Sequence, residues 1–487
     1  MRLIKRVNKK IVFYLLGLVT LVLGFTCLVP IVVSLIYSET RVAIPFALTF
    51  FLCVVIGFSM VYFNKDYHLP ISKKDGQIII GLLWIITPLF GALPYLFFPD
   101  IFTITGAIFE SYSGFTTTGS TIIDDLTKVP RGVLTYRAMT QWSGGLGFAV
   151  VIILILRSKA GLMMNIFNAE FSSIYKNKLY PHLSDTALRI FIIYTLLTII
   201  GCVLFSLGSM NGFQAFCHSL STVATGGFST ENGNIGAFTD SYTQYMVALL
   251  MFLSGTSYFI YFRLSKGDFK VLKDNQFLAY LMLILACSVV LVVYWLLFTS
   301  KPLLQDIKEA LFYTISIIST TGFDLESAKI GRAVSSALIF LMFIGGCSAS
   351  SASGLKIVRV ITLFRYTKVT LQKIFHPHAI IPVRYNGKSI PEEDLKNTFG
   401  FFFLYMVIFV IGVIVLCWLG NEFSHSLALS IANLGNVGPV VGGYMQGFTY
   451  SSLNIGSQFA LIILMLIGRL EIFAFLALFS KSLWREK

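Results

Sequence analysis

Charged residues are scarce in this sequence, and acidic ones are the scarcest. Only 12% of the 487 residues are charged, with 23 Asp and Glu against 37 Lys and Arg, whereas 56% are hydrophobic. This composition excludes an ordinary water-soluble domain. Long apolar runs at 11–37, 43–63, 276–299 and 398–419 reach the roughly 20 residues that a helix needs to cross a bilayer. We therefore expect an all-α polytopic protein embedded in a lipid bilayer.

Residues that build metal centres, disulfide frameworks and nucleotide sites are also rare or scattered. The seven Cys form no C-x-x-C pair and are typical of small core residues. His376 and His378 flank a proline without further ligands nearby, which is a weak metal pattern. The chain has no Walker motif and no Rossmann glycine fingerprint. We expect no bound nucleotide and, because the spans lack a nucleophile–base or metal set, no enzyme.

The net charge of +14 does not indicate nucleic-acid binding, because its distribution follows a membrane topology. Lys and Arg gather in alternate loops, at 2–10, 65–74, 157–178, 263–273, 359–396 and the C-terminus. This positive-inside pattern predicts that both termini are cytoplasmic. The first apolar run is too long for a signal-peptide core, and we expect an uncleaved helix there.

One stretch rich in Thr, Ser and Gly, SYSGFTTTGSTI at 111–122, has relatives about every 100 residues. They are SLSTVATGGFST (219–230), TISIISTTGFDL (314–325) and LSIANLGNVGP (429–439). We align them on Gly119, Gly227, Gly322 and Gly435, which places Thr117, Thr225, Thr320 and Asn433 two positions earlier. The fourth copy departs from the threonine pattern.

Each copy has the same neighbours. A long apolar run precedes it, and then comes a segment too short to span, at 103–114, 211–222, 306–318 and 423–432. A second long run follows the glycine, at 133–157, 241–262, 332–364 and 455–481. Four parallel units of helix, re-entrant helix, irregular segment and helix predict a pseudo-fourfold arrangement around a central pore, with ten spanning helices in all.

The irregular segments are the candidate ion site. Irregular backbone at membrane depth is tolerated only where it is buried in protein or lines water. Rings of backbone carbonyls can replace the hydration shell of a potassium ion, and helix C-termini pointing at the site favour a cation. The predicted cation ligands are Thr117, Thr118, Gly119, Thr225, Gly226, Gly227, Thr320, Thr321, Gly322, Asn433, Leu434 and Gly435. Ordinary Gly/Thr packing between membrane helices is the alternative.

The predicted organisation places these units in order along the chain. An N-terminal helix pair (1–70) precedes pore repeats at 71–180, 181–272 and 273–375, a cytoplasmic hairpin loop at 376–396, and a fourth repeat at 397–487. The hairpin is indicated by the alternating IIPVRY run, an Asn-Gly turn and the returning KSI.

A run of small residues, GGCSASSASG at 345–354, interrupts the third repeat where hydrocarbon is expected. We predict a flexible loop under the filter that blocks ions when ordered and clears the path when displaced. A kinked helix packed through small residues is the alternative. The predicted gate residues are Gly345, Gly346, Ser348, Ser350, Ser351, Gly354, Lys356 and, from the last apolar run, Arg469.

Arg469 stands deep in LIILMLIGRLEIFAFLAL, where an arginine costs about 2.5–3.5 kcal/mol without a partner or a wet cavity. We expect it to face the pore and raise the barrier for cations; a structural pair with Glu471 is the alternative. Glu110 is expected to accept hydrogen bonds from filter backbone. Acidic residues outside the filter either concentrate cations or are simply solvated: Asp124, Asp125, Glu231, Asp324 and Glu326.

Together these residues resemble the Trk/Ktr/HKT superfamily of potassium transporters. FESYSGFTTTGST, STVATGGFST, STTGF and ANLGNVGP resemble its four filter segments, and QWSGGLGF, GGCSASSASGLKIVRV and GRLEIF resemble its other signatures. The extra helix pair at 11–63 favours the TrkH type over the shorter Ktr type.

The resemblance implies K⁺ uptake across the cell (inner) membrane, with driving force from ion gradients. It also implies a homodimer and a cytosolic nucleotide-binding regulatory ring, such as TrkA, that contacts 376–390. Some sodium-selective plant relatives carry serine at the first filter glycine, so Gly119 implies potassium. A cation-coupled transporter of another solute is the alternative, and it requires more acidic residues in the spans than Glu110 and Glu471.

Overall fold

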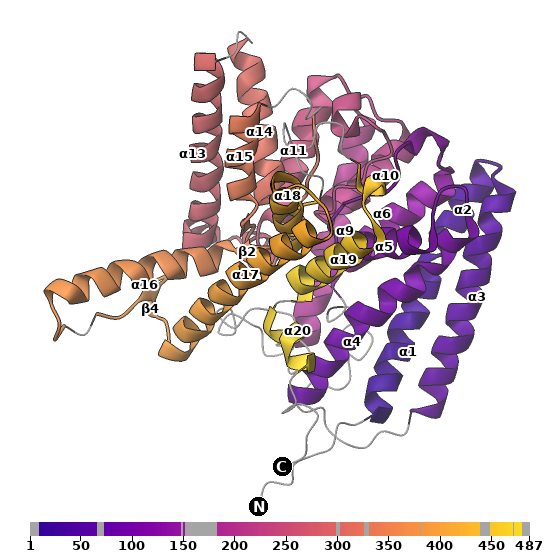
Figure 1. Ribbon diagram of the computed structural model, residues 1–487, viewed down its shortest axis with the longest axis horizontal. Helices are drawn as coiled ribbons and strands as arrows, with labels where there is room; N and C mark the ends of the chain where they lie inside the picture. The colour runs from indigo at the N-terminus through magenta and orange to yellow at the C-terminus, as the bar shows by residue number, and fades with distance from the viewer. Residues whose placement is uncertain are drawn as a thin grey trace, which may run out of the picture.

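The computed structural model describes residues 9–65, 73–147, 150, 183–298, 302–325, 331–379, 381–438, 449–470 and 472–479. Within these ranges the chain is almost wholly helical, and its only strands form two short two-stranded pairs. Figure 1 shows long helices packed side by side, with shorter helices between them. The predicted all-α fold class is confirmed.

The chain begins with three helices that precede the repeated units. They are α1 (Lys9–Thr26), α2 (Leu28–Ile36) and α3 (Thr40–Phe63). α1 and α3 lie against each other along much of their length (Figure 1). Gly17 and Gly57 allow this close packing, because a Cβ on either would press on the other's backbone oxygen.

Four units follow, each with a long helix, a short helix and a second helix. Unit 1 contains α4 (Lys73–Gly91), α5 (Ile104–Phe115) and α6 (Arg131–Leu146). Unit 2 contains α9 (Leu183–Ser206), α10 (Gly212–Val223), α11 (Ser241–Gly255) and α12 (Tyr258–Leu264). Unit 3 contains α13 (Asn275–Phe298), α14 (Leu303–Ile318), α15 (Arg332–Leu341) and α16 (Ile357–Phe375). Unit 4 contains α17 (Glu392–Trp418), α18 (Phe423–Leu434), α19 (Ile455–Leu470) and α20 (Ile472–Phe479). Single 3₁₀ turns lie at Leu93–Phe97, Leu126–Lys128, Asn234–Ala237, Phe269–Lys273 and Tyr450–Ser452.

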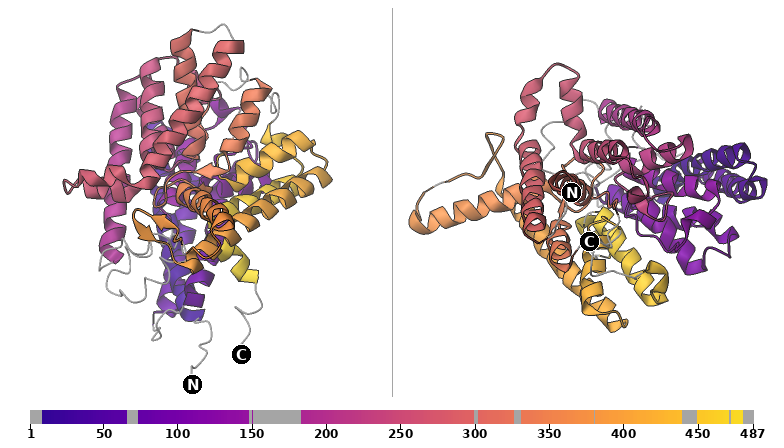
Figure 2. Two further views of the ribbon diagram at one scale, coloured as in Figure 1. Left: turned by 90° about the vertical axis from the view of Figure 1, so that its left-hand side faces the viewer. Right: turned by 90° about the horizontal axis from the view of Figure 1, so that it is seen from above.

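The short helices and the second helices alternate in a closed ring. α6 contacts both α5 and α10, α11 contacts α10 and α14, and α15 contacts α14 and α18. α19 then contacts α18 and returns to α5. Each second helix therefore separates the short helix of its own unit from that of the next unit. The C-terminal halves of the four short helices are largely buried. Figure 2 shows the same packed helices from two further sides.

Six helices in the described part of the chain are long and apolar enough to span a membrane, or seven if one bent pair is a single span. The sequence predicted ten, and the other predicted spans are the second helices of the units. Parts of the runs predicted at 133–157 and 455–481 lie outside the described residues. The predicted run at 241–262 bends by 93° between α11 and α12. At the bend, backbone groups of unit 2 bond to residues that are about 90 positions later in the sequence. Cys347 N–H donates to the Gly255 carbonyl at 2.9 Å, and Tyr258 N–H donates to the Ala349 carbonyl at 2.8 Å. Those backbone groups therefore bond to unit 3 instead of continuing the helix.

The predicted break in the third unit is present. α15 ends at Leu341, and residues 342–356 form a loop before α16 begins. Within this loop, β1 (Ile344–Gly345) and β2 (Leu355–Lys356) pair in parallel. The kinked-helix alternative is therefore wrong, because the chain leaves helical geometry altogether.

The predicted hairpin is confirmed as well. β3 (Arg384–Tyr385) and β4 (Lys388–Ser389) pair antiparallel around Asn386 and Gly387, whose φ angles are 48° and 78°. The hairpin is attached to the start of α13, because the Tyr385 hydroxyl and the Asn386 amide donate to Asp274 at 3.1 and 2.9 Å. Figures 1 and 2 show α16 and this hairpin projecting to one side of the helices.

We predict that Gly57→Ala loosens the N-terminal helices. An added Cβ would meet Leu21 and the Gly17 carbonyl oxygen at 2.8 and 2.9 Å, which forces α1 and α3 apart. Overpacking of this kind costs about 1–3 kcal/mol. The apparent melting temperature of the detergent-solubilised protein should fall by several degrees. Gly400→Ala is the control, since its Cβ would meet only Phe473 at 3.5 Å; equal melting temperatures in both variants would contradict the prediction.

Candidate functional site

The residues after each short helix share one backbone conformation. The N–H groups of Thr118, Gly226, Thr321 and Val437 donate to Ser113, Ser221, Ser316 and Ala432 carbonyls at 2.8–2.9 Å. The preceding residues, Thr117, Thr225, Thr320 and Asn436, have φ angles of 56°, 54°, 58° and 52°. The following glycines, Gly119, Gly227, Gly322 and Gly438, have φ angles of 84°, 81°, 77° and 92°. We name residues 117–119, 225–227, 320–322 and 436–438 the four filter segments.

The fourth filter segment lies three residues later than the sequence predicted. Asn433 and Leu434 still belong to α18, and Gly435 is its C-cap with φ −78°, the position that Thr116 has in unit 1. The sequence runs NLGNVG and offers two equivalent Asn-x-Gly registers. The helix continues through the first, so Asn436, Val437 and Gly438 replace the predicted Asn433, Leu434 and Gly435.

The filter segments contact one another through backbone. A Cβ built on Gly119 would overlap the Gly226 carbonyl oxygen, one on Gly227 would overlap that of Thr321, and one on Gly438 would overlap that of Thr118. Segment 1 therefore lies against segment 2, segment 2 against segment 3, and segment 4 against segment 1. Glycine is required at these places both for positive φ and for space.

The filter segments leave oxygen atoms available. In the described ranges, no hydrogen bond reaches the carbonyl oxygens of Thr117, Thr225, Thr320 and Asn436, which hold equivalent positions in the four units. The short helices end immediately before them, so the negative ends of four helix dipoles point at this region. Carbonyl oxygens and helix C-termini together favour a cation.

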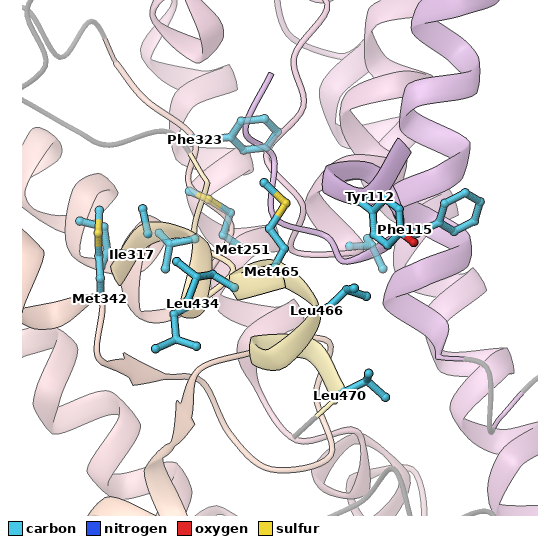
Figure 3. Close-up of a cluster of buried hydrophobic side chains, with 14 of the residues drawn as sticks. Tyr112, Phe115, Met251, Ile317, Phe323, Met342, Leu434, Met465, Leu466 and Leu470 are labelled. Atoms are coloured by element: carbon cyan, nitrogen blue, oxygen red, sulfur yellow. The ribbon is translucent and has the colours of Figure 1, made fainter. Parts of the chain in front are cut away.

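Behind the filter, a different side chain bonds the residues just beyond each of three segments. Glu110 accepts from the Thr121 hydroxyl at 3.0 Å and from Ile122 N–H at 3.2 Å, so its one backbone donor lies three residues after the filter segment from which the sequence predicted it would accept. In unit 2, His218 Nε2 lies 3.0 Å from the Ser229 hydroxyl. In unit 3, the Tyr313 hydroxyl donates to Asp324 at 2.9 Å. Apolar side chains fill much of the remaining space, with Met251, Met342 and Met465 in one buried cluster with Ile317 and Leu434 (Figure 3).

A cavity of about 370 Å³ opens above the first two filter segments. Gly119 and Gly227 form part of its wall, and three of the predicted acidic residues also line it: Asp124, Glu231 and Asp324. Asp125 lies beside them, and hydrogen bonds from the Thr127 hydroxyl, the Asn232 amide and Lys128 hold the pKa of its carboxyl well below the usual range. It therefore stays ionised at neutral pH. Glu326 lies outside the described residues.

The 342–356 loop contains the other predicted gate residues, Gly345, Gly346, Ser348, Ser350, Ser351, Gly354 and Lys356, and it contacts the filter. Ser353 N–H donates to the Thr320 hydroxyl at 2.9 Å. Ser351 hydrogen-bonds the Tyr258 hydroxyl, and Lys356 donates to the Ala352 carbonyl within the loop. The loop therefore lies directly against the third filter segment.

Arg469 binds this loop from α19. Its Nη1 donates to the Ser351 carbonyl and to the Ser353 hydroxyl, each at 3.0 Å, and its Nη2 donates to the Gly144 carbonyl at 2.6 Å. A cavity of about 80 Å³ lies beside these groups and is lined by Arg469 itself, Gly145, Tyr258 and loop residues. The loop and the arginine, predicted separately as gate residues, form one contact. Glu471 lies outside the described residues.

Comparison with known proteins supports this arrangement. Residues 44–487 match the TrkH family model, described as a cation transport protein. The chain is 33% identical to the Trk system potassium uptake protein TrkH of Escherichia coli K12, over 97% of this chain and 98% of that protein. It is 30% identical to the TrkH of Halomonas elongata, over 98% and 99% of the two chains. The crystal structure of the potassium transporter TrkH from Vibrio parahaemolyticus superposes with a TM-score of 0.89 at 29% identity, covering 98% of this chain and all of that one.

The chain belongs to the TrkH family. It is a multi-pass membrane protein of that family's fold.

One buried residue of this TrkH-family chain was missed from the sequence. Arg137 of α6 is 1% exposed and pairs with Glu110, with Nε 2.7 Å from Oε1. Arg137 is the second arginine of RGVLTYRAMTQW and lies inside the predicted run 133–157, so the argument used for Arg469 applies to it as well, since a charge at such a place needs a partner.

Arg469 is an exception to the pseudosymmetry of this TrkH-family fold. The second helices start after residues 130, 240, 331 and 454, and counting from these starts places Gly145, Gly255 and Gly346 at the position of Arg469. A Cβ on Gly145 or Gly255 would meet Ala224 or Ser319, just before the filter segment of the next unit.

We predict that Gly438→Ala damages the filter more than Gly435→Ala. Gly438 has φ 92° and no room beside the Thr118 oxygen, whereas Gly435 has φ −78° and tight contacts near 3 Å. Left-handed strain alone costs an alanine about 1–2 kcal/mol. Cation flux through the reconstituted protein should fall severalfold more for Gly438→Ala. A larger loss of flux in Gly435→Ala than in Gly438→Ala would contradict this prediction and favour Asn433, Leu434 and Gly435 as the fourth filter segment.

Proposed function

We propose that this protein takes up potassium across the cytoplasmic (inner) membrane through a pore between the four filter segments. The observation that carries the proposal is the left-handed backbone of Thr117, Thr225 and Thr320. A β-branched residue with positive φ is a strained outlier that costs about 1–3 kcal/mol and persists only where its surroundings impose it. Three such threonines at equivalent positions of three units indicate a backbone shaped for binding.

Potassium is the proposed ion on two grounds. The relatives in Escherichia coli and Halomonas elongata are named potassium uptake proteins. In addition, the filter segments leave carbonyl oxygens unbonded and approach one another through glycine, so oxygens from four sides can replace the hydration shell of a potassium ion. Carboxylates at the mouth raise the local concentration of cations.

The two alternatives from the sequence have no supporting observation. A coupled transporter of another solute would use acidic residues in the spans, but Glu110 is already committed to Arg137. For the second alternative, an intramembrane enzyme, the relatives offer no support, because they are named potassium uptake proteins. Membrane potential supplies about 2.3 kcal/mol per charge per 100 mV, enough to accumulate potassium without hydrolysis by this chain.

We propose that the 342–356 loop and Arg469 close the pore below the filter. The loop contacts Thr320 and Arg469 holds the loop, so ions leaving the filter meet both backbone and a positive charge. A cytosolic nucleotide-binding ring that docks at the 376–390 hairpin, which carries Arg384 and Lys388, would act on the start of α13 through the hairpin's contact with Asp274. From there Gln276 of α13 donates to the Ser348 carbonyl of the loop. Cytoplasmic termini and a homodimer complete the proposal.

Rubidium and potassium uptake into potassium-starved cells tests the function. Cells that express the wild-type chain should accumulate both ions, and Gly119→Ser should also admit sodium, because its side chain displaces the Gly226 carbonyl oxygen. Wild-type protein that is inserted in the membrane but moves neither rubidium nor potassium would refute the proposal. Unchanged selectivity in Gly119→Ser would refute only the role of that glycine.

We predict that Arg469→Ala raises potassium flux about threefold or more without changing ion preference, because it removes both a positive charge near the path and two bonds that hold the loop. Arg469→Lys separates these causes, since it keeps the charge but not the forked contacts. Lys270→Ala, on an exposed turn, is the control. Wild-type flux in a well-expressed Arg469→Ala variant would contradict the gate role.

A further inference from the structure

Two side chains of α6, one helical turn apart, reach the second filter segment. Gln141 donates from Nε2 to the Gly226 carbonyl at 2.7 Å and accepts from Phe228 N–H at 3.2 Å. Arg137 donates from Nη1 to the Ser229 carbonyl at 3.1 Å. The unit 1 helix therefore bonds three successive parts of the unit 2 backbone, from inside the filter segment to its outer end.

The same arginine is fixed on the unit 1 side. Its Nε pairs with Glu110 at 2.7 Å, its Nη2 donates to the Thr121 hydroxyl at 3.1 Å, and its guanidinium lies 4.1 Å from the centre of the Phe228 ring. Both charged groups are almost fully buried, with exposures of 1% and 0%. A buried pair whose donors and acceptors are used in this way is held in one geometry.

The other three units lack this polar contact. Counting from the helix starts, the equivalents of Arg137 are Val247, Leu338 and Leu461, and those of Gln141 are Met251, Met342 and Met465. All six are buried and apolar. Hydrogen bonds from the neighbouring helix thus hold the boundary between units 1 and 2, whereas apolar side chains occupy these positions at the other three boundaries.

The oxygen that Gln141 holds is also the one that lies against Gly119. A Cβ on Gly119 would overlap the Gly226 carbonyl oxygen, so that oxygen is confined between the glycine and the Gln141 amide. In the cavity-size account of selectivity, a filter discriminates potassium from the smaller sodium ion because its oxygens do not move inward around the smaller ion. An amide that fixes one carbonyl orientation opposes such a movement.

We propose that Gln141 and Arg137, the latter oriented by Glu110, are positioning residues that determine cation specificity by fixing the second filter segment. This inference rests on the proposed function. Loss of the Gln141 amide frees the Gly226 peptide to rotate, and sodium then enters a filter that still conducts potassium.

Gln141→Met is the direct test, because methionine occupies this position in the other three units and has a similar volume. The reconstituted variant should keep potassium uptake within about twofold of wild type, while its preference for potassium over sodium falls about fivefold, the worth of one net hydrogen bond. Met251→Leu, at the equivalent position of unit 2, is the matched control and should keep the wild-type preference.

The ion pair is tested with both charges removed together, since Arg137→Leu alone would leave Glu110 buried without its partner. Glu110→Leu with Arg137→Leu reproduces Leu429 and Leu461, the equivalents in unit 4. Replacing a buried ion pair by apolar residues is often neutral for stability. This double variant should lose potassium preference in the same direction as Gln141→Met.

Three outcomes are informative. The inference is overturned if both folded variants keep the wild-type preference for potassium over sodium. It is also overturned if the variants lose uptake of all cations equally and melt at a lower temperature, because this result shows a structural role only. A selective loss of preference in either folded variant supports it. If the wild-type protein moves no potassium, the proposed function itself fails, and this result is separate from the comparison between variants.

Discussion

The contact between a glycine of one filter segment and a carbonyl oxygen of the next organises the centre of this protein. It brings four stretches of backbone together so closely that Gly119, Gly227 and Gly438 have no space for a Cβ. Backbone without helical hydrogen bonds can exist at that depth only if protein surrounds it. The short helices supply this surrounding, because each ends where its segment begins and the segments lie buried among them.

Local patterns predicted those parts of the fold that depend on neighbouring residues. The first short helix was expected at 103–114 and lies at Ile104–Phe115, and the Asn386–Gly387 turn defined the hairpin. Two features depended on partners that are distant in the sequence, so neighbouring residues alone did not specify them. α11 ends at Gly255 because Cys347 bonds its carbonyl, and Arg137 is buried because Glu110 and Ser229 meet it in space. The fourth filter register failed for a third reason, since NLGNVG supports two readings equally.

Pseudosymmetry in this chain belongs to the backbone more than to the side chains. Glu110, His218 and Tyr313 hold equivalent positions and each bonds the residues just beyond its own filter segment, although one is acidic, one an imidazole and one a phenol. What the position requires is a hydrogen-bonding group of sufficient reach, so many residue types satisfy it. The filter positions with positive φ and close backbone contact permit far fewer residue types. The repeat is therefore visible in the sequence mainly as Thr-x-Gly.

The structure below the filter departs from fourfold symmetry, and a single chain makes this possible. Three of the four equivalent positions are glycine, while the fourth is Arg469, whose partly buried guanidinium needs acceptors. Ser351 and Ser353 of the 342–356 loop supply two of them, and the Gly144 carbonyl supplies a third. Displacing the loop removes two of these bonds, so the arginine stabilises the ordered position of the loop. The opening proposed for this loop therefore requires free energy from outside this contact, and the proposed partner can supply it only by binding the displaced state more tightly than the ordered one.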